Sequence, residues 1–266
     1  MMDFAIPVNI DETIPLSELF AKIAESGFGK LALTDNPQHC DYQQHTGRLQ
    51  LIAYAKERKL SFDTLHVPVG RDFDITSKHA DTRMGAVCNV ANTMHAARVL
   101  GVRTVVISAT HALPSPHGSD AQSLVHALEG LIETAEIMGI NLALRNLIDR
   151  RSLDSLAIAM EEYDSPRFGF CYDTALDLLA DHEPYAILEE YGDRLKAVLF
   201  ADTDGKVSRN LAPFTGIVDW HRVWAMLSVA GYRDPITLNV ALPNSITESL
   251  TILSEVRNKL DQSSLI

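Results

Sequence analysis

The hydrophobic pattern of this chain alternates between two periods from one end to the other. Short apolar runs rich in β-branched and aromatic residues are followed by longer segments whose apolar residues return every three or four positions. The first pattern is typical of buried strands and the second of amphipathic helices. We count eight rounds, in which the predicted strands span residues 3–10, 30–35, 62–68, 103–110, 141–147, 168–174, 195–202 and 235–242.

Glycines mark the ends of several predicted helices. Gly27, Gly101, Gly139 and Gly231 each stand just before a predicted strand, where a left-handed residue commonly closes a helix. Eight alternating strands and helices predict parallel βαβ units and favour a closed (β/α)8 TIM barrel. An open dinucleotide-binding sheet is disfavoured, because no GxGxxG motif follows the first strand. No linker or low-complexity tract divides the chain, so residues 1–266 are expected to form a single domain.

Polar residues stand at the ends of the last four predicted strands. They are Arg145, Asp173, Asp202 and Asn239. The strands of a parallel barrel all end at one mouth, and barrel enzymes have their active sites there. We therefore expect these four side chains to converge on the functional site.

The composition argues against several classes of partner. With 23 Lys and Arg against 35 Asp and Glu, the formal net charge is -12, which disfavours nucleic-acid binding. The three cysteines form no CxxC pair, which is typical of a reducing compartment, so a cytoplasmic protein is expected. The first residues do not resemble an export signal, and no apolar run reaches the length of a membrane span. We predict no membrane partner.

Seven segments spread over most of the chain resemble a known family. They are LHVP (65–68), NVANTMHAARVLGVRTVVIS (89–108), TAEIMGINLALRNL (134–147), SPRFGFCYDTALDLL (165–179), VLFADTDGK (198–206), APFTGIVDWHRVWAMLSVAGY (212–232) and ITLNV (236–240). Together they are similar to the xylose isomerase-like TIM barrels, which include sugar phosphate isomerases and epimerases, inosose dehydratases and endonuclease-type repair enzymes. The resemblance implies an isomerase-like protein of carbohydrate metabolism. It also implies a homo-oligomer, since these barrels often form dimers or tetramers, although no exposed apolar stripe requires one.

The resemblance implies a metal site that this sequence does not preserve. The family holds a divalent metal with a Glu after the fifth strand, an Asp after the sixth, a His in the seventh and a Glu after the eighth, and the two glutamates move a proton between adjacent sugar carbons. Here Arg145 stands in place of the first Glu, Leu199 in place of the His and Asn239 in place of the last Glu. Only Asp173 is kept, and it is followed by TAL where the family has TGH.

The charge of Arg145 makes this loss decisive. A catalytic divalent cation needs three or more protein ligands, whereas a guanidinium stays protonated and repels a nearby metal. We predict that Arg145 pairs with Asp173 in place of the ion, so no metal or other cofactor is expected. Neither Arg145 nor Asn239 can act as a base, so a metal-dependent 1,2-proton shuttle is not expected.

Three further residues are candidates for the site. His66 ends the third predicted strand, where it either lines the mouth or fills a structural role. His111 follows the fourth strand on a loop, and a solvated position is favoured over a place in the site. Arg209, in SRNLAPF (208–214), could reach over the mouth. The candidate catalytic residues are thus His66 and Asp173, and the candidate substrate-binding residues are Arg145, Asn239, Asp202, Arg209 and His111.

Three functions compete at this point. The first is a metal-free sugar isomerase or epimerase in which Arg145 binds a carboxylate or phosphate and His66 or Asp173 moves a proton. The second is a non-catalytic sugar-binding or regulatory protein. The third is a metalloenzyme with a new ligand set drawn from His66, His111, Asp173 and Asp202, which is disfavoured because Arg145 would sit beside the ion. In each case we expect a small carbohydrate or related ligand.

Overall fold

A closed barrel of parallel strands forms the centre of the molecule in the computed structural model, which describes residues 2–34, 36–109, 121–180, 182–207, 210–242 and 245–263. Consecutive strands are hydrogen-bonded neighbours, and the first strand pairs with the last to close the barrel. The predicted (β/α)8 fold is confirmed. The strands are β1 (Phe4–Pro7), β2 (Lys30–Leu33), β3 (Ser61–His66), β4 (Thr104–Ser108), β5 (Asn141–Arg145), β6 (Phe168–Asp173), β7 (Leu195–Phe200) and β8 (Ile236–Leu238).

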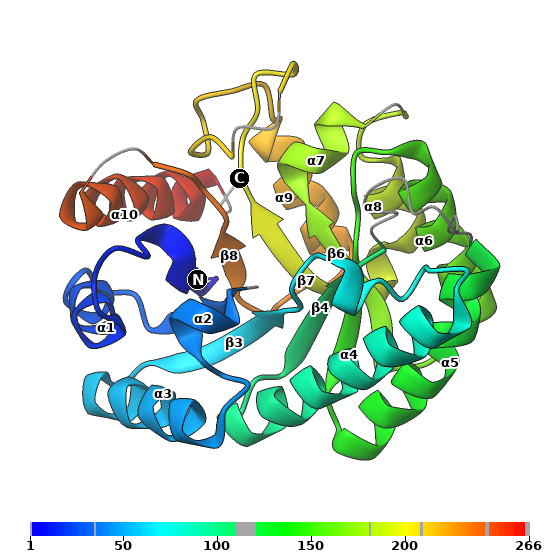
Figure 1. The fold of residues 1–266 in the computed structure, drawn as a ribbon. Coiled ribbons are helices and arrows are strands. Elements are labelled where there is room, and N and C mark those ends of the chain that lie inside the picture. Colours follow the sequence, from blue (N-terminus) through cyan, green and yellow to red (C-terminus); the bar gives the residue numbers. More distant parts are fainter. Residues whose placement is uncertain are drawn as a thin grey trace.

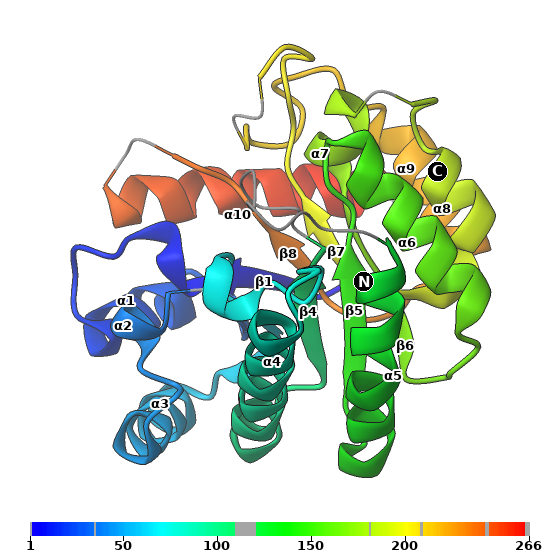
Figure 2. The same cartoon turned by 45° about the vertical axis from the view of Figure 1, so that its right-hand side comes forward.

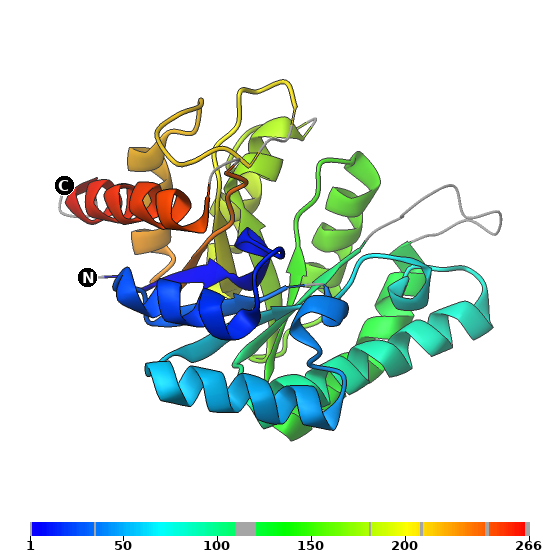
Figure 3. The ribbon, with the colours of Figure 1, turned by 60° about the vertical axis from the view of Figure 1, so that its left-hand side comes forward.

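Helices surround the barrel on its outside, as the three views in Figures 1, 2 and 3 show. Their buried faces pack on the strands in one large hydrophobic cluster. The α-helices are α1 (Leu16–Glu25), α2 (Pro37–Cys40), α3 (His45–Arg58), α4 (Ala80–Leu100), α5 (Ala121–Met138), α6 (Arg150–Glu162), α7 (Thr174–Leu179), α8 (Ala186–Tyr191), α9 (Trp220–Val229) and α10 (Ile246–Ser263), and the 3-10 helices are η1 (Val8–Ile10), η2 (Arg71–Phe73) and η3 (Gly192–Arg194).

The strand predictions were right in number and order but too long at the carboxyl ends. The first predicted strand ends at Pro7, and the chain then turns into η1. The four glycines predicted to close helices all adopt the left-handed conformation, with φ of 81° at Gly27, 74° at Gly101, 67° at Gly139 and 69° at Gly231. Because these turns lie at the amino-terminal end of the barrel, they leave the opposite end open for the site.

The strands divide their side chains between two environments. Alternate residues of a strand point to opposite faces, so the residues two positions apart share a face. A small buried cluster of Val106, Ala143, Cys171, Ala197 and Leu199 fills the inward side of β4 to β7. Residues that lie an even number of positions from these inward residues, at the carboxyl ends of the same strands, must therefore point into the mouth of the barrel.

Among the described residues, no helix combines the length and the apolar character that crossing a membrane would need.

Candidate functional site

A small cavity lies at the carboxyl ends of the strands. Its volume is about 190 Å³, and it is lined by side chains from both halves of the barrel. Its polar lining includes Thr34 after β2, His66 at the end of β3, Ser108 at the end of β4, Arg145 at the end of β5, and Thr237 and Asn239 at the end of β8. The floor carries Val106 and Leu199, which belong to the inner cluster. The expected convergence at the mouth therefore holds for Arg145 and Asn239, together with His66.

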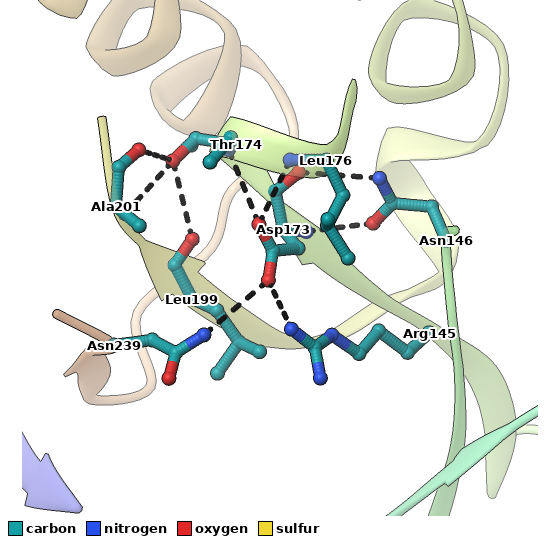
Figure 4. Close-up of polar contacts among 9 residues, drawn as sticks. Arg145, Asn146, Asp173, Thr174, Leu176, Leu199, Ala201 and Asn239 are labelled. Carbon is teal, nitrogen blue, oxygen red and sulfur yellow. Dashed lines mark hydrogen bonds and ion pairs between the residues drawn. The ribbon is translucent and has the colours of Figure 1, made fainter. Parts of the chain in front are cut away.

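Arg145 and Asp173 form an ion pair at this mouth. The Arg145 Nη2 to Asp173 Oδ2 distance is 2.5 Å; the arginine side chain is 22% exposed, whereas Asp173 is fully buried. Asp173 Oδ2 also accepts a longer hydrogen bond of 3.5 Å from Asn239 Nδ2. Its other oxygen accepts from the backbone N–H groups of Ala175 and Leu176, at 3.1 Å each, and so caps α7. Figure 4 shows Arg145 and Asn239 reaching the same oxygen.

Asn146 fixes the backbone of Asp173. Its side-chain oxygen accepts the Asp173 N–H at 2.7 Å, and its amide nitrogen donates to the Asp173 carbonyl at 3.1 Å. Asn146 is fully buried, so these bonds are shielded from water. The clamp joins the ends of β5 and β6 and holds the carboxylate of Asp173 beside Arg145 (Figure 4).

His66 is a neutral group in this cavity. Its ring is half-buried and lies 3.5 Å from the hydroxyl of Thr64 through Nε2. Burial, and to a smaller extent the positive charge of Arg145, lower the pKa of His66 to about 3. The imidazole is therefore uncharged at physiological pH and can exchange hydrogen bonds with a ligand, but it is a weak base.

The residues at the mouth do not fit a divalent cation. Of the four positions at which the family resemblance implies metal ligands, Asp173 alone offers a carboxylate, and a guanidinium already occupies it at 2.5 Å. Leu199 offers no donor, and Asn239 offers only an amide. Within the described ranges no three His, Cys, Asp or Glu side chains cluster as a metal site would require.

Asp202 lies outside this cavity. It is fully buried, and its carboxylate accepts the N–H groups of Thr203 at 2.9 Å and Val218 at 3.0 Å and the indole N–H of Trp220 at 3.2 Å. It has the same parity as Phe200, whose ring lies 4.9 Å from that of Trp220 in the helix layer. The expectation that Asp202 contacts a ligand is not supported by this placement, since Asp202 instead stabilises the loop between β7 and α9.

Two of the predicted site residues, His111 and Arg209, lie outside the described residues. The neighbouring Asn210 is described, has a φ of 46° and lines the cavity.

The sequence reasoning missed Thr237, which is the most informative lining residue. Thr237 is 2% exposed, and its hydroxyl has no hydrogen-bond partner among the described residues. Buried hydroxyls are nearly always paired with protein groups or ordered water, so a polar partner for this one is expected in the folded protein. Thr237 stands two residues before Asn239 and thus on the same face of β8, a signal that was available in the sequence.

The closed barrel, with a polar cavity at its carboxyl-end mouth, is the architecture of a TIM barrel protein. The sequence model of the xylose isomerase-like TIM barrel matches residues 20–256. The chain belongs to this family. No curated protein matched its sequence.

Solved structures with the same fold include sugar epimerases. A D-tagatose 3-epimerase-like protein matches with a TM-score of 0.81 and 20% identity over 98% of this chain and 99% of that one. The 3-keto-D-glucoside 4-epimerase YcjR from E. coli gives 0.78 and 18% over 97% and 100%. The IOLI protein, described with a bound zinc atom, gives 0.81 and 14% over 97% and 98%. At these identities the likeness establishes the fold.

Proposed function

We propose that this protein is a divergent sugar isomerase/epimerase-like barrel that binds a small sugar, polyol or sugar acid in the mouth cavity without a metal ion. The observation that carries the proposal is the mouth cavity itself, whose lining carries donors and acceptors from Thr34, His66, Ser108 and Asn239. A polyhydroxylated ligand would supply hydrogen-bond partners for these groups. The 3-keto-D-glucoside 4-epimerase among the structural neighbours acts on a ligand of this kind, as its name states.

The size of the cavity supports a small ligand. A volume of about 190 Å³ is below the range of about 300–1,000 Å³ that is usual for drug-sized molecules. The lining offers hydroxyl, amide and imidazole groups, which match the alternating donors and acceptors of a sugar. The charge of Arg145 is balanced by Asp173, so a neutral ligand does not leave an uncompensated cation.

The surroundings of the two candidate bases favour binding over catalysis. Asp173 is fully buried and receives bonds at both oxygens, so its lone pairs are engaged within the protein. His66, with its pKa lowered to about 3 by burial, is a poor proton acceptor at neutral pH. Neither candidate for the catalytic base is suited to taking a proton from a sugar carbon, which supports the non-catalytic sugar-binding alternative.

A metal-free reaction on a sugar acid is the second candidate. It is favoured by one observation, namely that the Arg145 guanidinium is partly exposed and lines the cavity, where it could bind a carboxylate.

A thermal-shift screen tests the proposal. Ketoses, aldoses, polyols, inositols and sugar acids are added to the purified protein, with and without divalent metals, and each ligand that stabilises the protein is then assayed for conversion. We expect at least one of these compounds to raise the melting temperature equally well in the presence of EDTA, since a ligand at a hundred times its Kd stabilises by about 2.7 kcal/mol. Conversion of a sugar acid would favour the second candidate. Absence of stabilisation by every compound, or stabilisation only with metal, would contradict the proposal.

A matched pair of variants ties the binding to this cavity. Thr237→Val removes the unpaired hydroxyl and should weaken the ligand about tenfold while leaving the stability of the free protein unchanged or higher. Thr93→Val removes another buried threonine hydroxyl, which donates to the Asn89 carbonyl at 3.0 Å on α4. This control should leave ligand affinity unchanged.

A further inference from the structure

We propose that the ligand carries a less polar substituent on its sugar ring, as a glycoside does, and that a second pocket beside the mouth cavity receives this substituent. The inference deepens the proposed function and rests on it. It comes from the way two cavities share one wall.

The second pocket, here called the outer pocket, adjoins the mouth cavity. It has a volume of about 390 Å³ and is lined by Asn9 and Ile10 of η1, by Asn210, and by the residues from Asn239 to Leu242 after β8. Asn9, Asn210 and Asn239 also line the mouth cavity. The two spaces are therefore neighbours that meet at these asparagines.

The wall between the two pockets is held in place by backbone contacts. The N–H of Ala241 donates to the carbonyl of Asn210 at 2.8 Å, and the N–H of Asn239 donates to the carbonyl of Phe200 at 2.9 Å. The first bond joins the segment after β8 to the segment after β7, and the second joins it to the last residue of β7. The side chain of Asn239 is further held by its contact with Asp173. The position of the wall is thus set by the barrel itself.

The two pockets differ in the chemistry of their linings. Beside apolar residues that include Val67, Val106 and Leu199, the mouth cavity presents the polar side chains of Ser108, Thr237, His66 and Arg145. Among the described residues that line the outer pocket, those other than the shared asparagines are all apolar, namely Ile10, Val240, Ala241 and Leu242. A polar ring and an apolar substituent are separated in the same way in an alkyl or aryl glycoside. The amide groups of the shared asparagines suit the linking oxygen and the hydroxyls next to it, because an amide both donates and accepts.

Matched glycosides test the inference. Isothermal titration calorimetry compares the α- and β-anomers of phenyl and methyl glycosides of glucose, galactose and mannose, each with its free sugar. The ring is the same within each set, so the difference isolates the substituent. We expect the phenyl glycoside of at least one sugar to bind about tenfold more tightly than its methyl glycoside, since apolar burial of a ring is worth at least this much.

Variants of the outer pocket test whether the preference for phenyl glycosides arises there. Leu242→Ser removes part of the half-buried apolar wall and should abolish the preference for phenyl over methyl glycosides while leaving the affinity for the methyl glycoside unchanged. Ala241→Trp keeps the backbone N–H and fills the pocket from its rim, so it should weaken the phenyl glycoside selectively. Leu49→Ser, at a leucine on α3 that is 53% exposed, is the matched control and should change neither affinity.

The outcomes separate the inference from the function on which it rests. A phenyl preference that Leu242→Ser removes supports the outer pocket. Equal binding of phenyl and methyl glycosides, or a phenyl preference that both outer-pocket variants retain, overturns the inference and leaves the proposed sugar site standing. Failure of every free sugar and glycoside to bind overturns the proposed function itself.

Discussion

Replacing Arg145 with an apolar side chain of similar length tests the ion pair on which the site depends. Arg145→Met removes the guanidinium that lies 2.5 Å from Asp173 Oδ2 and keeps most of the packing of the side-chain stem. Among the described residues, the fully buried carboxylate then keeps its two backbone donors and the longer contact from Asn239. Removing one partner should therefore expose the cost of burying the other.

The magnitude follows from the burial of the two partners. Removing one member of a fully buried pair costs about 3–5 kcal/mol. The arginine is 22% exposed and the carboxylate keeps other donors, so solvent and these bonds reduce the loss to about 2–3 kcal/mol. The entropy of unfolding of a 266-residue chain is about 0.6 kcal/mol/K, which converts this loss into a fall of about 4–5 °C in melting temperature.

A double-mutant cycle measured by urea denaturation is the assay. It comprises the parent, Arg145→Met, Asp173→Asn and the double variant. Because the double variant carries no uncompensated carboxylate, it should be at least as stable as Arg145→Met. The reasoning would be refuted if Arg145→Met cost less than about 0.5 kcal/mol and the changes in the free energy of unfolding of the two single variants added up to that of the double variant. Two residues that interact strongly should give non-additive changes.

Three further predictions concern the surroundings of the site and the base of the barrel. Asn146→Leu leaves the N–H and C=O of Asp173 without their buried partners and should cost about 2–4 kcal/mol in urea denaturation. Burial raises the pKa of Asp63 to about 6, so the folded state binds this proton more tightly than the unfolded state. The resulting contribution to stability is full below about pH 4 and is lost as the pH rises through 6. The free energy of unfolding of the parent relative to Asp63→Asn should therefore fall by an amount on the order of 2–3 kcal/mol between pH 4 and pH 7.5. Gly216→Ala would place a Cβ against the carbonyl oxygen of Thr203, so it should cost about 1–3 kcal/mol and increase protease cleavage of the loop between β7 and α9.

Each of these predictions has a result that would contradict it. An Asn146→Leu protein as stable as the parent would mean that the two hydrogen bonds from Asn146 to the Asp173 backbone do not contribute to stability. A pH-independent difference between the parent and Asp63→Asn, or one that grows with pH, would contradict the raised pKa. A Gly216→Ala loop with unchanged stability and cleavage would show that the close approach is easily relieved.

The sequence was sufficient for the barrel because its signals are local and repeated. Each strand is an apolar run of the right length, and glycines such as Gly101 and Gly139 close helices in the left-handed conformation that the pattern requires. The pairing of Arg145 with Asp173 also followed from the sequence, because two opposite charges at adjacent strand ends of one barrel have few other partners.

The lining of the site was harder to predict, because it depends on which face of a strand each residue occupies. Asp202 ends an apolar run and is therefore expected at the mouth, yet β7 ends at Phe200 and the alternation of side chains directs Asp202 to the helix layer. Thr237 gives no signal of its own, because a single threonine in a strand is common and its place in the cavity depends on residues from other strands. The alternation of side chains along a strand accounts for both residues. Asp202 lies three positions from the inward Leu199 and so faces outward, whereas Thr237 lies two positions from Asn239 and so faces the cavity with it.

Metal binding tests the central claim most directly. The purified protein is incubated with Mn²⁺, Mg²⁺ or Zn²⁺, desalted and subjected to elemental analysis beside Asp173→Ala, and each titration is repeated by calorimetry. If the guanidinium of Arg145 occupies the position of the ion, the parent should hold no more metal than Asp173→Ala. Near-stoichiometric metal in the parent that disappears in Asp173→Ala would contradict the account.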